Sequence, residues 1–215
     1  MSFNDKIADK VKEIPRSGIR DFFELVLGRD DVISLGVGEP DFSSPWHIRE
    51  AAIYSLEKGE TSYTSNLGME KLRKAISASV QKQFNVNYDY RSEVLVTVGV
   101  SEALDLACRA LLNPGDEVIY HEPCYVSYDP SISLAYGCPV SVPTRSENNF
   151  EVRAEEIEKK ISPKSKILIL NFPTNPTGAV MKQKELQDIA DLCISKDLIV
   201  ITDEIYSELV YEDDY

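Results

Sequence analysis

The 215-residue sequence predicts an α/β fold in which a mostly parallel sheet is flanked by helices. Two short aliphatic runs, residues 167–170 and 198–201, have the length and composition of fully buried parallel strands. Between them, apolar residues recur at helical spacing over 184–196. A strand, a helix and a second parallel strand connect by a right-handed crossover almost without exception, so we expect both strands in one sheet.

The remaining segments alternate between strand and helix patterns. Strands are expected at 32–35, 94–98, 117–121 and 139–142. Helices are expected at 45–58, 69–84, 102–112 and 154–161, with a further helix opening at 122–125. In the 45–58 helix, the apolar side chains expected to face inward are those of Ile48, Ala51, Ala52 and Leu56. An apolar stripe that should serve as core or as a subunit contact comprises Phe22, Phe23, Leu25, Val26 and Leu27.

The composition limits the partners and the location that we expect. A net charge of −13 argues against nucleic acid or an anionic membrane as partner, because either needs a basic face. No apolar run approaches the roughly 18 residues that a membrane-spanning helix needs. The N-terminus is polar and lacks a signal-peptide core. We therefore expect a cytoplasmic protein.

Cysteine and histidine usage points to no metal site. The four cysteines form no CxxC pair and are expected to be reduced and partly buried thiols. His47 and His121 are isolated in the sequence, so a zinc ion would lack ligands.

Polar residues follow the two strands on either side of the 184–196 helix. The first strand is followed by Asn-Pro-Thr-Gly at 175–178, and the second by Thr-Asp-Glu-Ile-Tyr at 202–206. Ligands of open α/β sheets bind outside the carboxyl ends of the strands, so Asn175, Asp203 and Tyr206 should face one crevice. Together these three residues offer a carboxylate, an amide and a phenol. A heteroaromatic ring with a basic nitrogen on one side and a phenolic oxygen on the other would form contacts with all three groups.

A second polar feature lies at Gly99-Val100-Ser101, between the expected 94–98 strand and 102–112 helix. The N-terminus of a helix presents free N–H groups and a positive dipole end, which suits a phosphate. The Ser101 hydroxyl would add a donor and would cap the helix. No Walker loop and no GxGxxG motif is present, so a dinucleotide is not favoured.

In this order, the two strand-end motifs closely resemble the class I/II aminotransferases, which are pyridoxal-phosphate enzymes of fold type I. By that resemblance, Asp203 would pair with the protonated pyridine nitrogen of the cofactor. Asn175 and Tyr206 would hydrogen-bond the ring's 3-oxygen. Val100 and Ser101 would hold the phosphate, and an aromatic residue at the place of Tyr125 would stack on the ring.

The resemblance also implies a dimer and a substrate contact. Tyr63 matches a tyrosine that reaches the cofactor phosphate of the other subunit, which implies a homodimer. Gly38 matches a residue whose backbone is offered to the carboxylate of the amino acid, and Asn175 would also border the substrate. The implied reaction moves an amino group between an L-amino acid and a 2-oxo acid.

The resemblance covers essentially the whole chain but only the first half of the family's length. It implies an N-terminal arm and small-domain segment at 1–45 and a cofactor-binding large domain at 46–215. The lysine that forms the Schiff base would follow later, so we expect a fragment that lacks its catalytic lysine. The lysines in this part of the chain do not match the position of that lysine in the family; they are Lys164, Lys166, Lys182, Lys184 and Lys196.

Three alternatives are kept beside this interpretation. The first is another reaction on the same fold, such as that of a C–S lyase, a decarboxylase or a cyclopropane-forming synthase. The second is a catalytically inactive half-protein that binds the cofactor. The third, a transcription regulator, is disfavoured because the residues before Gly36 are too few and not basic enough for a DNA-binding domain.

Overall fold

The computed structural model describes residues 2–15, 31–33, 38 and 42–210. The chain forms two compact units, one comprising residues 1–15 and 98–215 and the other residues 16–97. The domain boundary between residues 45 and 46 stays a prediction. The stripe Phe22–Leu27 and the second half of the expected 32–35 strand, residues 34 and 35, lie outside the described residues.

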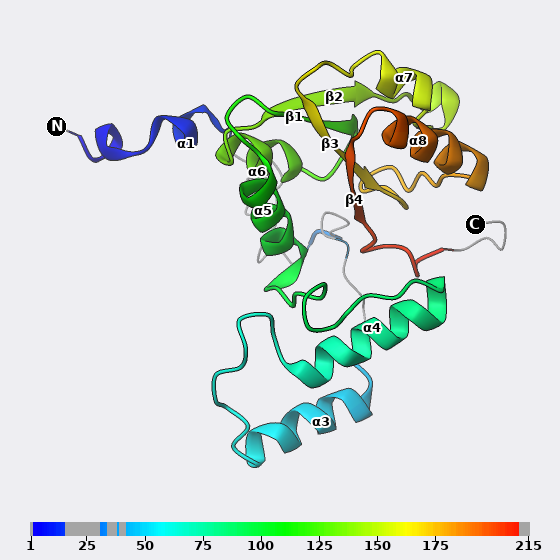
Figure 1. Ribbon diagram of the computed structural model, residues 1–215. Coiled ribbons are helices and arrows are strands. Elements are labelled where there is room, and N and C mark those ends of the chain that lie inside the picture. The colour runs from blue at the N-terminus through cyan, green and yellow to red at the C-terminus, as the bar shows by residue number, and fades with distance from the viewer. Residues whose placement is uncertain (1, 16–30, 34–37, 39–41, 211–215) are drawn as a thin grey trace. The chain divides into compact units, whose positions relative to one another are not determined.

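The larger unit contains a four-stranded parallel sheet with the strand order β2-β1-β3-β4 (Figure 1). Its strands are β1 (Glu117–Glu122), β2 (Cys138–Pro143), β3 (Ser165–Asn171) and β4 (Ile199–Asp203). Every neighbouring pair is parallel. The α/β prediction and four of the expected strands are therefore confirmed.

Helices cover both faces of this sheet (Figure 1). One hydrophobic cluster joins β1 and β3 to α5 (Gly99–Leu111) and α6 (Tyr128–Leu134). A second cluster joins the other face of β1 and β3 to β2, α7 (Ala154–Glu158) and α8 (Gln183–Ser195). The alternation of strand side chains separates the clusters: Ile167 and Ile169 belong to the first, Leu168 and Leu170 to the second. The shorter elements are η1 (Phe3–Lys6), α1 (Asp9–Glu13) and η2 (Ser146–Asn148).

The last strand differs from the expectation of full burial. In β4, Ile199 is 39% exposed and Val200 is 41% exposed. Within the described residues β4 has a neighbour on one side only, namely β3, so it is an edge strand. Its aliphatic run is typical of an interior strand, but burial also needs a second neighbour and a cover on each face.

Two helices of this unit begin at other positions than predicted. Helix α5 begins at Gly99 rather than at residue 102, which places Val100 and Ser101 in its first turn. Ser101 is therefore not the cap; the N-cap is Val98, whose N–H donates to the carboxylate of Glu102. Helix α6 begins at Tyr128, so residues 122–125 do not open a helix but form the loop before it. Local spacing does not determine where a first turn forms, since helix ends depend on caps and on packing.

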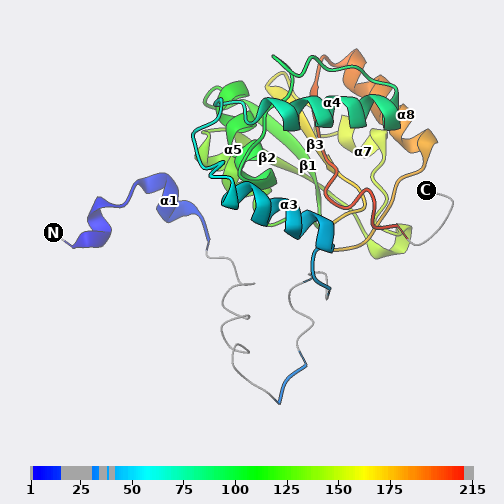
Figure 2. The ribbon, with the colours of Figure 1, turned by 90° about the horizontal axis from the view of Figure 1, so that it is seen from below.

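The smaller unit contains α3 (Trp46–Glu57) and α4 (Glu70–Phe84), joined by an open loop (Figure 2). The helices expected at 45–58 and 69–84 are confirmed. The prediction that one face of α3 points inward is wrong. Ile48 is 54% exposed and Leu56 is 66% exposed, and Ala51 and Ala52 are also exposed. Periodicity predicts which side chains share a helix face, but what covers that face depends on tertiary contacts.

The predicted strand at 94–98 does not form among the described residues. A strand requires pairing over several consecutive residues, and residues 94–98 are not part of a strand although Val96 donates its N–H to the Leu67 carbonyl at 3.0 Å. Gly68, next to it, has φ +95°, and a Cβ there would lie 2.6 Å from the Cβ of Val96. Both the backbone conformation and the space require glycine.

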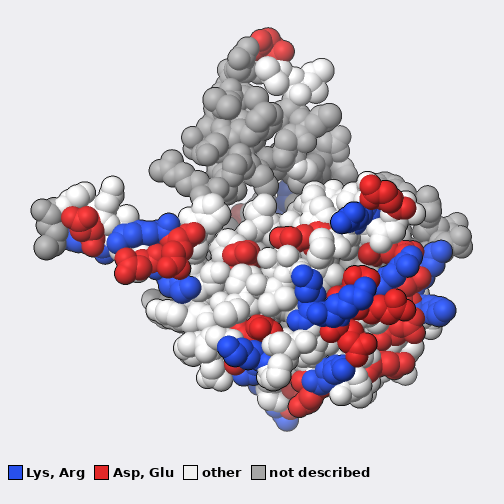
Figure 3. All heavy atoms as spheres, turned by 90° about the horizontal axis from the view of Figure 1, so that it is seen from above, with Lys and Arg blue, Asp and Glu red and all other residues white. Residues whose placement is uncertain are grey.

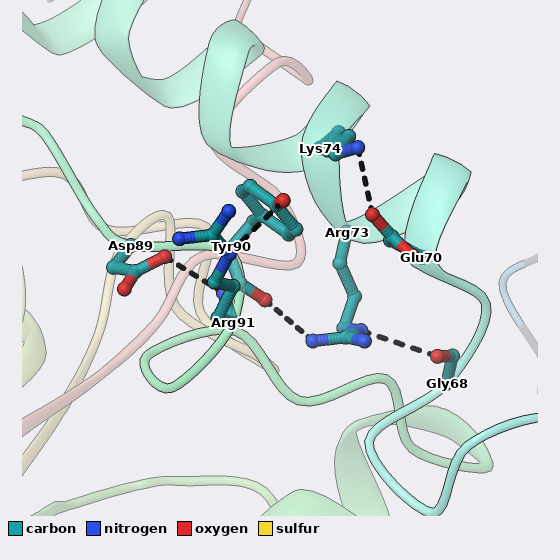
Figure 4. A network of polar contacts seen from close by, with 7 residues as sticks. All are labelled: Gly68, Glu70, Arg73, Lys74, Asp89, Tyr90 and Arg91. Carbon is teal, nitrogen blue, oxygen red and sulfur yellow. Dashed lines mark hydrogen bonds and ion pairs between the residues drawn. The ribbon is translucent and has the colours of Figure 1, made fainter.

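A buried arginine holds this part of the smaller unit together (Figure 4). Arg73 of α4 is 7% exposed; its Nε donates to the Gly68 carbonyl at 3.1 Å and its guanidinium to the Tyr90 carbonyl at 2.6 Å. One turn of α4 also carries the ion pair between Lys74 and Glu70 at 2.7 Å. Arg73 thus connects the loops before and after α4, which is a structural role.

The face of the molecule shown in Figure 3 carries both positively and negatively charged side chains. In Figure 3, Lys and Arg side chains on this face lie among Asp and Glu side chains. Lys196 at the end of α8 pairs with Glu158 of α7 at 2.9 Å.

None of the described helices is both long enough and apolar enough to cross a membrane. The four cysteines are free; Cys108 and Cys193 are buried, Cys124 is half-buried and Cys138 is exposed.

Candidate active site

A cavity of about 220 Å³ lies at the carboxyl ends of the strands, beside the first turn of α5. The side chains that line it come from α5, from the loops after β1, β3 and β4, and from the end of β3 and β4 themselves. They are Val100, Ser101, Tyr125, Asn171, Asn175, Asp203, Ile205 and Tyr206. All belong to the larger unit. The expectation that Asn175, Asp203 and Tyr206 share one crevice is confirmed.

The parallel register of β3 and β4 brings these groups together. Asn171 and Asp203 are the last paired residues of the two strands, so the loop that contains Asn175 and the turn that contains Tyr206 leave the sheet at the same edge. The side-chain amide of Asn175 lies 3.4 Å from the phenolic oxygen of Tyr206. The amide and the phenol can therefore act on one ligand oxygen, with the carboxylate of Asp203 nearby.

The carboxylate of Asp203 is held from two sides. The phenol of Tyr128 donates to Oδ2 at 2.8 Å, and the N–H of Ile205 lies 3.3 Å from Oδ1. Tyr128 is 2% exposed, and burial, together with the bond to Asp203, raises the pKa of its phenol. The phenol therefore stays protonated at neutral pH and acts as a donor to Asp203.

The first turn of α5 forms another side of the cavity. Gly99 has φ +76°, a conformation that favours glycine, and it turns the chain into the helix. Val100 and Ser101 follow in the first turn, whose N–H groups have no acceptor within the helix. With the Ser101 hydroxyl, this end of the cavity suits an anion.

Tyr125 adds an aromatic wall. Its ring meets that of Tyr128 edge to face, with centroids 5.8 Å apart and an interplanar angle of 82°. The neighbouring Cys124 is half-buried, and burial raises the pKa of its thiol to about 12. The thiol is therefore protonated at neutral pH and unsuited to act as a nucleophile.

The two predicted site residues outside this cavity lie in the smaller unit. Tyr63 is fully exposed, and a Cβ at Gly38 would meet no atom within 4 Å. Their expected roles stay predictions. No lysine is among the residues that line the cavity. Lys166 lies near the start of β3 and pairs with Asp116 at 2.9 Å, and Lys182 and Lys196 flank α8.

Sequence reasoning missed Asn171, Tyr128 and Ile205. Asn171 follows the aliphatic run 167–170, and a polar residue directly after such a run marks the carboxyl edge of a sheet. Tyr128 follows Tyr125 by three residues, a spacing that would have placed both on one helix face. No local pattern indicates that its phenol meets Asp203.

The donor set fits pyridoxal phosphate. A carboxylate held by two donors can pair with a protonated ring nitrogen, and the amide and phenol of Asn175 and Tyr206 can reach a phenolic oxygen. A helix N-terminus with a serine suits the phosphate group. Among the described residues no cluster of His, Cys, Asp or Glu could hold a metal ion.

Comparisons with known proteins show the family of the chain. The family model described as aminotransferase class I and II matches residues 30–215. An aspartate aminotransferase of Pyrococcus abyssi is 44% identical over 96% of this chain and 53% of its own length. An aromatic-amino-acid aminotransferase of Thermococcus litoralis is 40% identical over 96% of this chain and 53% of its own. The solved aspartate aminotransferase of Thermotoga maritima has a TM-score of 0.92 at 36% identity and covers 97% of this chain and 56% of that one.

The chain thus spans about half the length of the curated relatives it matches. The family model nevertheless covers most of the chain, and the identities are high over nearly all of it. The parallel sheet and its flanking helices have the fold of the solved fold type I aspartate aminotransferases. This chain belongs to the class I and II aminotransferase family.

Proposed function

We propose that the protein expressed from the natural gene is a pyridoxal-phosphate-dependent aminotransferase. It would move an amino group between an L-amino acid and a 2-oxo acid. The observation that carries this proposal is the single cavity that collects Ser101, Tyr125, Asn175, Asp203 and Tyr206 from distant parts of the chain. The relatives named above, which are aspartate and aromatic-amino-acid aminotransferases, favour this reaction over the C–S lyase, decarboxylase and synthase alternatives.

The residues that would contact the cofactor ring have the following proposed tasks. When bound, the cofactor supplies an electron-withdrawing ring that stabilises negative charge on the substrate carbon. Asp203 keeps a proton on the ring nitrogen, and Tyr128 and Ile205 keep its carboxylate in place. Asn175 and Tyr206 donate to the phenolic oxygen of the ring.

The remaining contacts position the ring. The first turn of α5 holds the phosphate through the N–H groups of Val100 and Ser101 and through the Ser101 hydroxyl. Tyr125 packs on the ring, a contact that contributes roughly 0.5–1.5 kcal/mol beyond burial. We further propose that Gly38 and Asn175 border the substrate and that Tyr63 reaches the phosphate of a second copy, which makes the protein a homodimer.

The chemistry also needs an amine that holds the cofactor covalently and moves a proton. The described cavity has no lysine, and we propose that this lysine lies outside these 215 residues. The cytoplasmic location stays a prediction.

The test is transamination by the protein expressed from the natural gene, with aspartate and aromatic amino acids as donors and 2-oxoglutarate as acceptor. We expect glutamate to form. Asp203→Asn removes the charge that pairs with the ring nitrogen and should lower kcat by about 100-fold or more. Glu204→Gln is the matched control, because it removes the same charge from the exposed neighbouring residue and should change kcat by less than about twofold. Release of ammonia and a 2-oxo acid without glutamate would contradict the proposal.

A further inference from the structure

The side chain of Asn171 connects two residues to which we assign contacts with the cofactor ring. Asn171 is the last residue of β3 and is 1% exposed. A buried amide is costly unless its donor and its acceptor are both used. Both are used here, and both partners lie in the candidate active site.

The two hydrogen bonds of this amide run in different directions. Its Nδ2 donates to the main-chain carbonyl of Asp203 at 2.8 Å, and its Oδ1 accepts from the N–H of Asn175 at 3.0 Å. One partner is a carbonyl and the other an N–H, so their chemistry determines which branch of the amide carries the nitrogen. The side chain therefore ties the end of β4 to the loop that follows β3.

The main chain of Asn171 is fixed as well. Its carbonyl accepts from the hydroxyl of Thr174 at 2.7 Å, and Thr174 is 5% exposed. The carbonyl of Thr174 in turn accepts from the N–H of Gly178 at 2.8 Å. The loop of residues 172–178 is thus anchored at Asn171, and the side chain of Asn171 has little freedom to follow a shift of β4.

We infer that Asn171 is a positioning residue that sets the spacing between Asn175 and Asp203 for the cofactor ring. This inference rests on the proposed function. The amide offers an acceptor on one branch and a donor on the other, which matches the N–H of Asn175 and the carbonyl of Asp203. An aspartate at this position would keep the acceptor for Asn175 but lose the donor to Asp203, and an alanine would lose both.

The experiment uses the protein expressed from the natural gene, freed of cofactor and titrated with pyridoxal phosphate. Asn171→Ala should raise the dissociation constant by roughly tenfold or more, because two buried hydrogen bonds are lost next to the ring contacts. The pH midpoint of the visible absorbance of the bound cofactor should also shift, by about 0.5 unit or more, since the groups that contact the ring have moved.

The matched control is Ser165→Ala, at the opposite end of the same strand. Ser165 donates to the carboxylate of Glu117 at 2.8 Å, so its removal weakens β3 without touching the cavity. This variant should bind pyridoxal phosphate within about twofold of the wild type and keep its absorbance midpoint. Asn171→Asp is the second test variant if Asn171→Ala does not fold, and it should show the same two changes.

The outcomes separate the inference from the proposed function. If the wild type binds pyridoxal phosphate but the Asn171 variants match Ser165→Ala in both readouts, the inference is wrong and the proposed function stands. If the wild type shows no saturable binding of pyridoxal phosphate, the proposed function is wrong and the inference is overturned with it.

Discussion

The hydrogen bond between Tyr128 and Asp203 offers a test of how the site is held. Tyr128→Phe removes one oxygen atom and leaves the ring, which is buried in the first hydrophobic cluster and packed edge to face on Tyr125. The loss is therefore confined to the 2.8 Å bond to Oδ2 of Asp203. Little cavity is created, because the phenyl ring fills the same space.

The magnitude follows from the type of bond. A hydrogen bond to a charged group contributes about 1.5–3 kcal/mol to stability. Asp203 lines the cavity, so water can replace the lost donor, and we expect the lower end, about 1.5 kcal/mol. The assay is the urea midpoint of the cofactor-free protein, converted with the slope of free energy against urea concentration. Tyr136→Phe, at a tyrosine that is 59% exposed, is the control and should cost less than about 0.5 kcal/mol.

The alkaline side of the stability profile gives a second readout for the same variant. Burial and the bond to Asp203 raise the pKa of Tyr128, so the folded state holds the phenolic proton more tightly than the unfolded state. This contribution is complete below the unfolded pKa of about 10 and is lost as the pH rises towards the folded pKa. The wild type should therefore lose more stability above about pH 10 than Tyr128→Phe. Burial also raises the pKa of Tyr120, but that effect is common to both proteins and cancels in the difference.

Two results would refute this reasoning. The first is a Tyr128→Phe variant as stable as Tyr136→Phe at neutral pH. The second is a coupling energy near zero in the double-mutant cycle of Tyr128→Phe with Asp203→Asn, because two groups that share a hydrogen bond must be energetically coupled.

Two further predictions concern the backbone and a buried imidazole. Gly68→Ala should destabilise the protein by about 2–4 kcal/mol, because its positive φ is strained for alanine and its Cβ would meet Val96. Gly59→Ala, with φ +71° but open space, should cost only about 1 kcal/mol by urea denaturation; equal costs would contradict the steric part. Burial lowers the pKa of His121 to about 4, so stability should fall as the pH drops from about 6.5 towards 4, by roughly 3 kcal/mol. His121→Gln should abolish most of this fall in urea midpoints between pH 7 and pH 4, whereas His47→Gln, at an exposed histidine, should leave it unchanged.

The sequence was sufficient where a feature depends on neighbours along the chain. The interior strand β3 carries a run of aliphatic residues, β1 carries Val118, Ile119 and Tyr120, and the positions of both strands agree with the prediction. The turn residues after β3 and the polar residues after β4 were predicted to meet because parallel strands end at a common edge. The two strand-end motifs also indicated the family, which the comparisons show.

Tertiary structure decided the features that depend on pairing across the chain. Residues 94–98 have the composition of a strand but do not form one, and β4 has the composition of an interior strand but lies at the edge of the sheet that the described residues form. Helix α3 shows the same dependence on tertiary contacts. Its periodicity predicts the helix correctly, but the side chains that were expected to be buried are exposed. The composition of a segment limits the secondary structure that it can form, and its tertiary contacts decide which structure forms and how far it is buried.

The site shows the same division. The sequence by itself determined that Asn175, Asp203 and Tyr206 would stand at one edge of a parallel sheet, since their types and order are local facts. Only the tertiary structure decided that the phenol of Tyr128 reaches Asp203 and that the amide of Asn171 ties Asp203 to Asn175. The two bonds that reach Asp203 join residues 75 and 32 positions apart in the chain, and no periodicity or turn preference encodes a contact over such a separation.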